Sequence, residues 1–196
     1  MRLAALLTGL VLALSTALAG AHEVEYKVIL DGASESPSNA SPGSGTGLVT
    51  FDLDLVTMRV QASFVDLMGT TSASHIHCCT AVPGAGTAGV ATVTPSFTGF
   101  PLGVTSGSYD HTFDLSMASS YNPAFITASG GTVSDALNAL LFGAADGKAY
   151  LNIHTSMFPG GEIRGFLVPV PEPGTYLMLL AGLGLFGFVA ARRARR

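Results

Sequence analysis

Apolar and polar residues alternate with a period of two in eight short segments of this 196-residue chain, and this alternation limits the fold more than any other feature. Residues two apart share one face of a strand, so each segment can bury one face and leave the other polar. Clusters of Gly, Ser, Pro and Asp separate the segments. The pattern predicts an all-β, antiparallel β-sandwich or barrel. The segments are 24–28, 49–55, 58–64, 74–77, 89–94, 108–115, 148–154 and 162–168.

Two neighbouring segments and one helical segment add detail to this prediction. Segments 49–55 and 58–64 are separated by two residues and should pair as a hairpin. Ser134–Phe142 carries three leucines on one helical face, so it predicts a short crossover helix. Thr132 or Ser134 can cap its start and Gly143 can close its end.

The N-terminus has the order of parts of a secretory signal peptide. Arg2 supplies a positive charge, residues 3–18 are almost wholly apolar, and small residues follow. Cleavage after Ala19 or after Ala21 satisfies the small-x-small requirement, and the second choice leaves His22 as the new N-terminus. Residues 1–21 are therefore predicted to be removed on export.

The C-terminus, residues 170–196, resembles the PEP-CTERM sorting signals of Gram-negative bacteria. Pro171, Glu172 and Pro173 precede an uncharged apolar run, 176–191, and four terminal arginines. Sixteen residues at 1.5 Å rise span about 24 Å, so this segment would cross a bilayer of about 30 Å only if the bilayer thins or flanking side chains snorkel. The arginines would stay in the cytoplasm. An ordinary tail anchor with a chance Pro-Glu-Pro is the alternative.

This resemblance implies a partner and a location. An exosortase-type sorting enzyme would remove the tail of a protein held transiently in the inner membrane. The protein would then reach the cell surface or the extracellular matrix, where exopolysaccharide or other matrix components are possible partners.

The remaining residues, 22–169, are enough for one domain with a real core. They hold four basic residues against twelve carboxylates, a net charge of −8. Such an acidic body repels phosphate backbones, so we expect no nucleic-acid partner.

Three histidines are the candidate metal ligands. His75 and His77 share a strand face, and His154 lies on the face opposite Ile153. If the isoleucines face the core, all three histidines lie on the outer face, and they meet if the two strands are neighbours. Imidazoles in this spacing suit copper or zinc. The favoured interpretation from the sequence alone is a structural role, with each ring hydrogen-bonded to loop backbone, and the metal site is the alternative.

Cys78 and Cys79 follow the histidine pair directly. In an oxidising compartment they can form a vicinal disulfide, join another chain, bind a soft metal beside the histidines, or remain free. The disulfide is the favoured interpretation.

Two segments carry a further resemblance, which covers most of residues 23–168. His75-Ile-His77 with its following Gly/Ala-rich stretch, and the run from Tyr150 to Gly165, are similar to the CHRD domain, found in secreted proteins. This family implies a β-sandwich and an exported location, without an established reaction. Glu162 and Arg164 in this run share a strand face, and we expect cross-strand partners to neutralise them.

A fainter resemblance is to copper-zinc superoxide dismutases, an Ig-like β-barrel family. It implies a copper site at His75, His77 and His154 with Arg164 as a guiding arginine. Only His111 lies between His77 and His154, so the bridging histidine and the zinc ligands of that family are missing.

The sequence as a whole predicts a signal peptide (1–21), an Ig-like or superoxide-dismutase-like β-sandwich of the CHRD type (22–169) and a sorting signal with a short transmembrane helix (170–196). The expected function is that of a non-enzymatic structural or binding protein without catalytic residues or cofactor. The alternative is an extracytoplasmic copper-binding or redox protein.

Overall fold

The alternating segments form strands in the computed structural model, which describes residues 22–171, 180, 182–184, 186 and 192–194. The all-β prediction is confirmed, with one exception among the segments. Residues 89–94 make only single bridges, Val90 with His77 and Thr92 with Tyr121, and form no strand. The strands are β1 (Glu23–Asp31), β2 (Ser44–Asp52), β3 (Thr57–Val65), β4 (Thr71–His77), β5 (Gly107–Asp114), β6 (Tyr150–Thr155), β7 (Ile163–Phe166) and β8 (Val168–Pro169).

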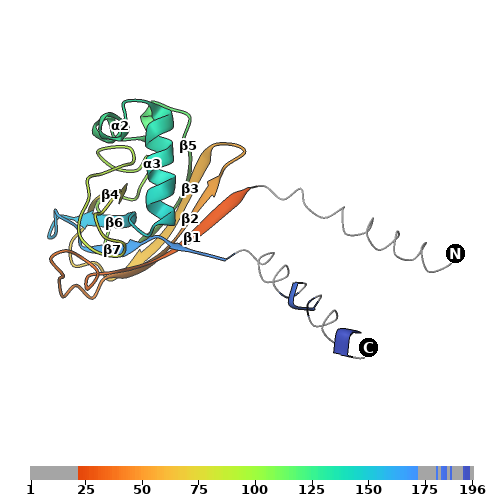
Figure 1. The fold of residues 1–196 in the computed structure, drawn as a ribbon. Coiled ribbons are helices and arrows are strands. Elements are labelled where there is room, and N and C mark those ends of the chain that lie inside the picture. Colours follow the sequence, from red (N-terminus) through yellow and green to blue (C-terminus); the bar gives the residue numbers. More distant parts are fainter. Residues whose placement is uncertain (1–21, 172–179, 181, 185, 187–191, 195–196) are drawn as a thin grey trace.

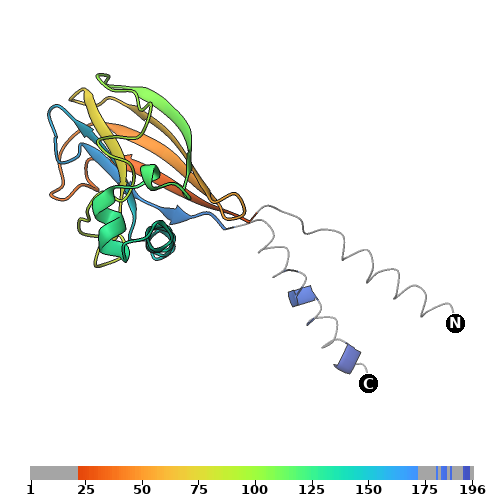
Figure 2. The ribbon, with the colours of Figure 1, turned by 90° about the horizontal axis from the view of Figure 1, so that it is seen from above.

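Antiparallel pairing joins these strands in the order β4-β6-β7-β1-β2-β3-β5, with β8 also paired to β1. The predicted hairpin is confirmed, since β2 and β3 pair from Ser44 and Val65 to Asp52 and Thr57. Figures 1 and 2 show that the sheet is strongly curled. A Cβ atom placed on Gly47 of β2 would lie 3.2 Å from Leu151 of β6, so the two halves of the sheet face each other across the core.

The core lies inside this curl. Ile76 and Ile153 are fully buried there, which turns the histidines beside them to the opposite face of the sheet. Burying one such side chain contributes roughly 1.5–3 kcal/mol relative to leaving it exposed. Other core residues that are at most 1% exposed include Val28, Leu30, Val49, Phe51, Met58, Val60, Phe64, Leu151 and Ile163.

Two helices, α2 (Pro123–Ser129) and α3 (Val133–Ala145), form the crossover between β5 and β6 after a short 3-10 turn, Ala118–Ser120. The predicted helix is α3, and the Thr132 side chain caps it by accepting a hydrogen bond from the backbone of Asp135. We did not expect α2. Its signals are Asn122, which accepts from the backbone of Ala124, and Pro123 at the first helical position.

Gly143 does not close α3, contrary to the prediction, because the helix continues to Ala145. A Cβ atom at Gly143 would overlap the sulfur atoms of both Cys78 and Cys79. The glycine is therefore needed for space inside the helix and not for a left-handed cap.

The predicted signal peptide, residues 1–21, lies outside the described residues, as do Glu172, Pro173 and most of the predicted transmembrane segment. Pro171 is described and is exposed after β8. Among the residues that the structure describes, no helix is both long enough and apolar enough to span a bilayer.

We expect Gly143→Ala to destabilise the protein. Replacing glycine by alanine inside a helix ordinarily stabilises it by about 0.5–1 kcal/mol, but here the new methyl group overlaps the two sulfur atoms. Urea unfolding of Gly143→Ala beside Asn138→Ala, a helix-favouring change at an exposed position of α3, measures the effect. A Gly143→Ala protein as stable as Asn138→Ala would contradict this packing.

Candidate metal centre

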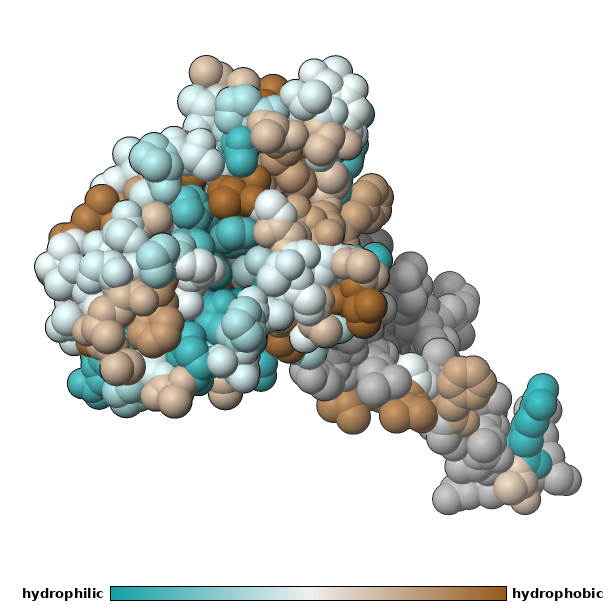
Figure 3. All heavy atoms as spheres, turned by 90° about the vertical axis from the view of Figure 1, so that its left-hand side faces the viewer, coloured by the Kyte–Doolittle hydropathy of each residue, from teal (hydrophilic) through white to brown (hydrophobic). Residues whose placement is uncertain are grey.

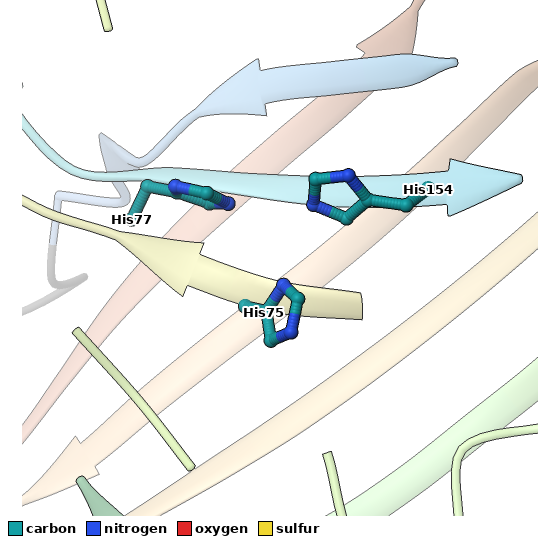
Figure 4. A group of neighbouring side chains, drawn as sticks. All are labelled: His75, His77 and His154. Atoms are coloured by element: carbon teal, nitrogen blue, oxygen red, sulfur yellow. The ribbon is translucent and has the colours of Figure 1, made fainter. Parts of the chain in front are cut away.

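Strand register brings the three predicted histidines together. His75 and His77 lie on β4 and His154 lies on β6, and these strands are neighbours in the sheet. Ala73 pairs with His154 and His75 with Asn152, so His154 is diagonally opposite His75. The ring centroids are 5.1 Å apart for His75 and His154, 5.6 Å for His77 and His154, and 5.7 Å for His75 and His77. Figure 4 shows the three rings gathered over the two strands.

The histidines lie on the face of the sheet away from the core, as expected, and loops cover this face. His75 is 6% exposed and His77 is 8% exposed, because backbone from residues 88, 95 and 159 lies against the histidine rings. Figure 3 shows the side of the molecule that carries the loop after β1 and the turn between β6 and β7. Hydrophilic side chains gather near the centre of this side. The histidines are therefore enclosed between a sheet and polar loops.

Each ring donates one N–H group to a backbone carbonyl. Nε2 of His75 lies 2.5 Å from the oxygen of Pro95, Nδ1 of His77 lies 2.9 Å from that of Ala88, and Nδ1 of His154 lies 2.9 Å from that of Pro159. A carbonyl only accepts, so each of these nitrogens carries the ring proton. Such bonds from the second ring nitrogen fix the tautomer and orientation of metal-ligating histidines.

The other nitrogen of each ring has no hydrogen-bond partner although it is buried. These atoms are Nδ1 of His75, Nε2 of His77 and Nε2 of His154. One potential ligand atom from each ring lies within 4.8 Å of the other two. Buried polar atoms in proteins are nearly always hydrogen-bonded, so each of these three nitrogens is open to a water molecule or a metal ion as its partner.

Burial also keeps the rings neutral. Loss of hydration around the charged form lowers the pKa of His75 and of His154, and it lowers the pKa of His77 to about 4. The carbonyl bonds act in the opposite direction and only partly offset this effect. At neutral pH each ring therefore has a lone pair on its unpartnered nitrogen, which is the form that binds a metal.

A stack of side chains supports His77. The Tyr150 ring lies parallel to His77, with centroids 4.8 Å apart and planes at 4°. The guanidinium carbon of Arg164 lies 4.7 Å from the other face of Tyr150. Arg164 donates to the backbone oxygen of Ser34 at 2.5 Å and to that of Gly86 at 2.9 Å. Its partners therefore come from two covering loops, not from a neighbouring strand as expected.

The dismutase resemblance gave Arg164 a guiding role that its position does not favour. Arg164 is 3% exposed, and its guanidinium is bound to loop backbone. The carboxyl group of Glu35 lies 3.7 Å from Nε of Arg164. Arg164 holds the loops over the histidines.

Sequence reasoning missed Glu35. Burial raises the pKa of its carboxyl group to about 7, although Arg164 and the backbone of Ser36 act to lower it. A cavity of about 350 Å³ between residues 35–39 and 157–161 borders this carboxyl group. Glu35 lies in a Ser/Pro-rich loop without periodicity, so no sequence signal marked it.

Glu162 is fully buried and is bound by the loop after β1, by the loop between β3 and β4 and by the end of β6. Its carboxylate accepts hydrogen bonds from the hydroxyl groups of Ser41 and Thr155, both at 2.6 Å. It also accepts from the backbone N–H groups of Met68 at 2.5 Å and Gly69 at 3.1 Å. Thr155 belongs to β6, the strand paired with β7, so it is the cross-strand partner that we expected for Glu162. The other three donors come from loops.

Cys78 and Cys79 are joined by a disulfide in the structure. Their sulfur atoms lie against α3, near Gly143 and the backbone oxygen of Ala139. Within the described part of the chain, the candidate ligand group holds three histidines and no cysteine. The disulfide ends β4 beside His77 without entering the site.

The fold and the site together describe one class of protein. It is an all-β domain in which polar loops cover three histidine rings and backbone carbonyl groups orient them. The chain belongs to the CHRD domain family, whose model matches residues 26–167. A second model, the PEP-CTERM protein-sorting motif, matches residues 169–196. This motif implies export, processing by an exosortase-type enzyme and sorting to the cell envelope or surface. Neither the curated proteins nor the solved structures give a significant match.

We expect Glu162→Gln to cost about 1–3 kcal/mol at pH 7, because an amide cannot accept all four hydrogen bonds. Burial raises the pKa of Glu162, but the bonds from Ser41, Thr155, Met68 and Gly69 outweigh it and hold the pKa below its ordinary value of 4.5. The stabilisation is therefore complete above about pH 4.5 and is lost as the pH falls through the lower, folded-state pKa.

Urea unfolding at several pH values checks this prediction, with the exposed Glu23→Gln as a control for the lost charge. The difference between the wild type and Glu162→Gln should shrink below pH 4.5. A difference that stays constant down to pH 3, or one no larger than that of the control, would contradict it.

Proposed function

We propose that this chain is an exported, non-enzymatic protein that binds a transition-metal ion, copper or zinc, through His75, His77 and His154 at the cell surface. Its signal peptide, residues 1–21, is removed on export. The segment after Pro171-Glu172-Pro173 holds the precursor in the inner membrane until an exosortase-type enzyme releases it to the surface or the extracellular matrix.

The observation that carries this proposal is the set of three buried, unpartnered ring nitrogens. A purely structural histidine would use both nitrogens or expose one to water, since an unsatisfied buried polar atom costs roughly 1–3 kcal/mol. Here one nitrogen of each ring is satisfied by a carbonyl and the other is left free. In metal sites, each ligating histidine likewise binds the ion through one ring nitrogen and donates a hydrogen bond from the other.

Burial of the ligand atoms supports binding without turnover. Three protein ligands leave one coordination position for a further ligand, but turnover also requires that substrate can reach that position. The free nitrogens of His75, His77 and His154 are all shielded from water by the covering loops. Arg164 is likewise enclosed and is not available to draw anions to a surface copper ion.

The ligand set favours two ions. Imidazole is a ligand that copper and zinc both accept. Three neutral imidazoles satisfy copper(I), which is stable with three ligands, whereas zinc would add a water to complete a tetrahedron. Ligand nitrogens about 2.0–2.1 Å from one ion lie about 3.3 Å apart. The ligand atoms now lie within 4.8 Å of one another, so the three rings would move closer together on binding.

The purified mature protein should bind one copper(I) or zinc ion at this site. His75→Ala/His77→Ala should lower the affinity by more than about 100-fold, because one imidazole cannot hold the ion. His111→Ala is the matched control, since His111 lies on β5 and outside the histidine group. Competition titration with chromophoric chelators measures both ions.

A folding check and a third variant separate loss of the ligands from loss of the fold. Circular dichroism and thermal unfolding of each variant show whether it remains folded, and His154→Gln removes a ligand at the least buried of the three positions. Equal affinity in all variants, or no binding by the folded wild type, rules out the site and leaves the histidines as structural residues.

The sorting proposal predicts a shortened protein in a host that has the sorting enzyme. Intact-mass analysis of the surface fraction should show a chain that ends near Pro171-Glu172-Pro173 and lacks the terminal arginines. A variant with alanine at these three positions should stay full-length in the inner membrane. Wild-type protein found only in the inner membrane with its tail attached would exclude this route.

A further inference from the structure

The start of the domain contains a second group of ligand atoms. The backbone nitrogen of His22 lies 3.2 Å from Oδ2 of Asp54, and Nδ1 of the same histidine lies 3.2 Å from Oδ1. Both side chains are largely exposed, at 80% and 57%. Both nitrogens of a potential chelate therefore meet the two oxygens of one carboxylate at the surface.

Backbone bonds hold Asp54 in this place. The N–H group of Leu53 donates to the backbone oxygen of His22 at 3.0 Å, which ties the β2–β3 turn to the residue before β1. Inside the turn, Oδ1 of Asp52 accepts from the backbone of Asp54 at 3.0 Å and of Leu55 at 2.9 Å. The Asp54 carboxylate is thus positioned by the hairpin and does not depend on its contact with His22 alone.

We propose that cleavage after Ala21 converts this contact into a surface copper(II) site formed by the α-amino group of His22, its Nδ1 and the Asp54 carboxylate. The proposal rests on the export proposed above and is independent of the site at His75, His77 and His154. In the precursor the nitrogen of His22 belongs to a peptide bond, and its delocalised lone pair cannot bind a metal. After cleavage it is an amine with a usable lone pair.

The chemistry of these three atoms selects copper(II) among common ions. The amine and Nδ1 of one histidine close a six-membered ring with the metal, and mixed N,O ligands in a planar arrangement suit copper(II) or nickel(II). Neighbouring ligands about 2.0 Å from an ion lie about 2.8 Å apart, close to the 3.2 Å separations seen here. Binding releases one proton from the ammonium group, and the proton on Nδ1 moves to Nε2.

Electrostatics favour a cation at this place. The hydrogen bonds from the backbone and the ring of His22 hold the pKa of Asp54 below its usual range, so its carboxylate is charged at neutral pH. Glu23 and Asp52, a directly paired couple at the ends of β1 and β2, add negative charge nearby. The site forms only when the signal peptide is removed, so metal binding there is confined to the exported protein.

Copper(II) titration followed by electron paramagnetic resonance tests the site on three full mature chains. One begins at His22, one carries Asp54→Asn, and one has a four-residue Gly-Ser extension before His22. His75, His77 and His154 are unchanged in all three, so their contribution cancels. The chain that begins at His22 should bind one additional copper(II). The extension should lower that affinity by more than about 100-fold and Asp54→Asn by about 10-fold.

Two results would overturn the inference. The first is an extended chain or an Asp54→Asn chain that binds copper(II) within twofold of the chain beginning at His22. The second is a mature protein whose N-terminus, read by mass spectrometry, is Gly20 or an uncleaved Met1. The N-terminal comparison remains valid if the histidine group on β4 and β6 proves not to bind metal, so the two proposals fail separately.

Discussion

The carboxylate of Glu162 is the interaction on which the architecture around the site depends. It is fully buried, and it is retained as a charge because four donors, from two loops and from the end of β6, surround it. A buried carboxylate without such donors would cost several kcal/mol, so the loops and the charge require each other. Arg164, two residues later, is also buried, and it donates hydrogen bonds to the backbone oxygens of Ser34 and Gly86. Gly86 lies two residues before Ala88, so Arg164 helps to hold one of the loops that cover the histidines on β4 and β6.

This covering decides what the histidines can do. On an open sheet they would be solvated and would titrate near pH 6.5. Under the loops their pKa values fall, and carbonyl groups that the loops supply fix one nitrogen of each ring. The same loops exclude water from the remaining nitrogens. Burial, tautomer and orientation therefore have a single physical origin, and together they favour retention of an ion over catalysis on it.

The two proposed metal sites differ in burial and in charge, because one lies under the loops and the other lies at the surface. The histidine group on β4 and β6 consists of neutral, enclosed nitrogen ligands, which suits a firmly held ion. The group at His22 and Asp54 is exposed and anionic, and it needs a free α-amino group, which only processing provides. An acidic, exported domain with both would hold one ion in its interior and exchange another with its surroundings.

The sequence by itself determined most of the strands, the family and the C-terminal sorting signal. Period-2 alternation fixed which side chains face the core, and it placed His75 and His77 on one face and His154 on the face opposite Ile153. The ordered parts of the C-terminal motif identified the sorting signal, because such a signal is read as linear sequence. Helix α2 was missed although Asn122 and Pro123 marked it, and residues 89–94 alternate without gaining a partner strand.

Only the tertiary structure decided that β4 and β6 are neighbours, that loops bury the histidines, and that Gly143 makes room for a disulfide. Those facts depend on contacts between residues far apart in the chain, such as Glu162 with Ser41 or Arg164 with Gly86, and local pattern does not encode which distant backbone group a side chain will meet.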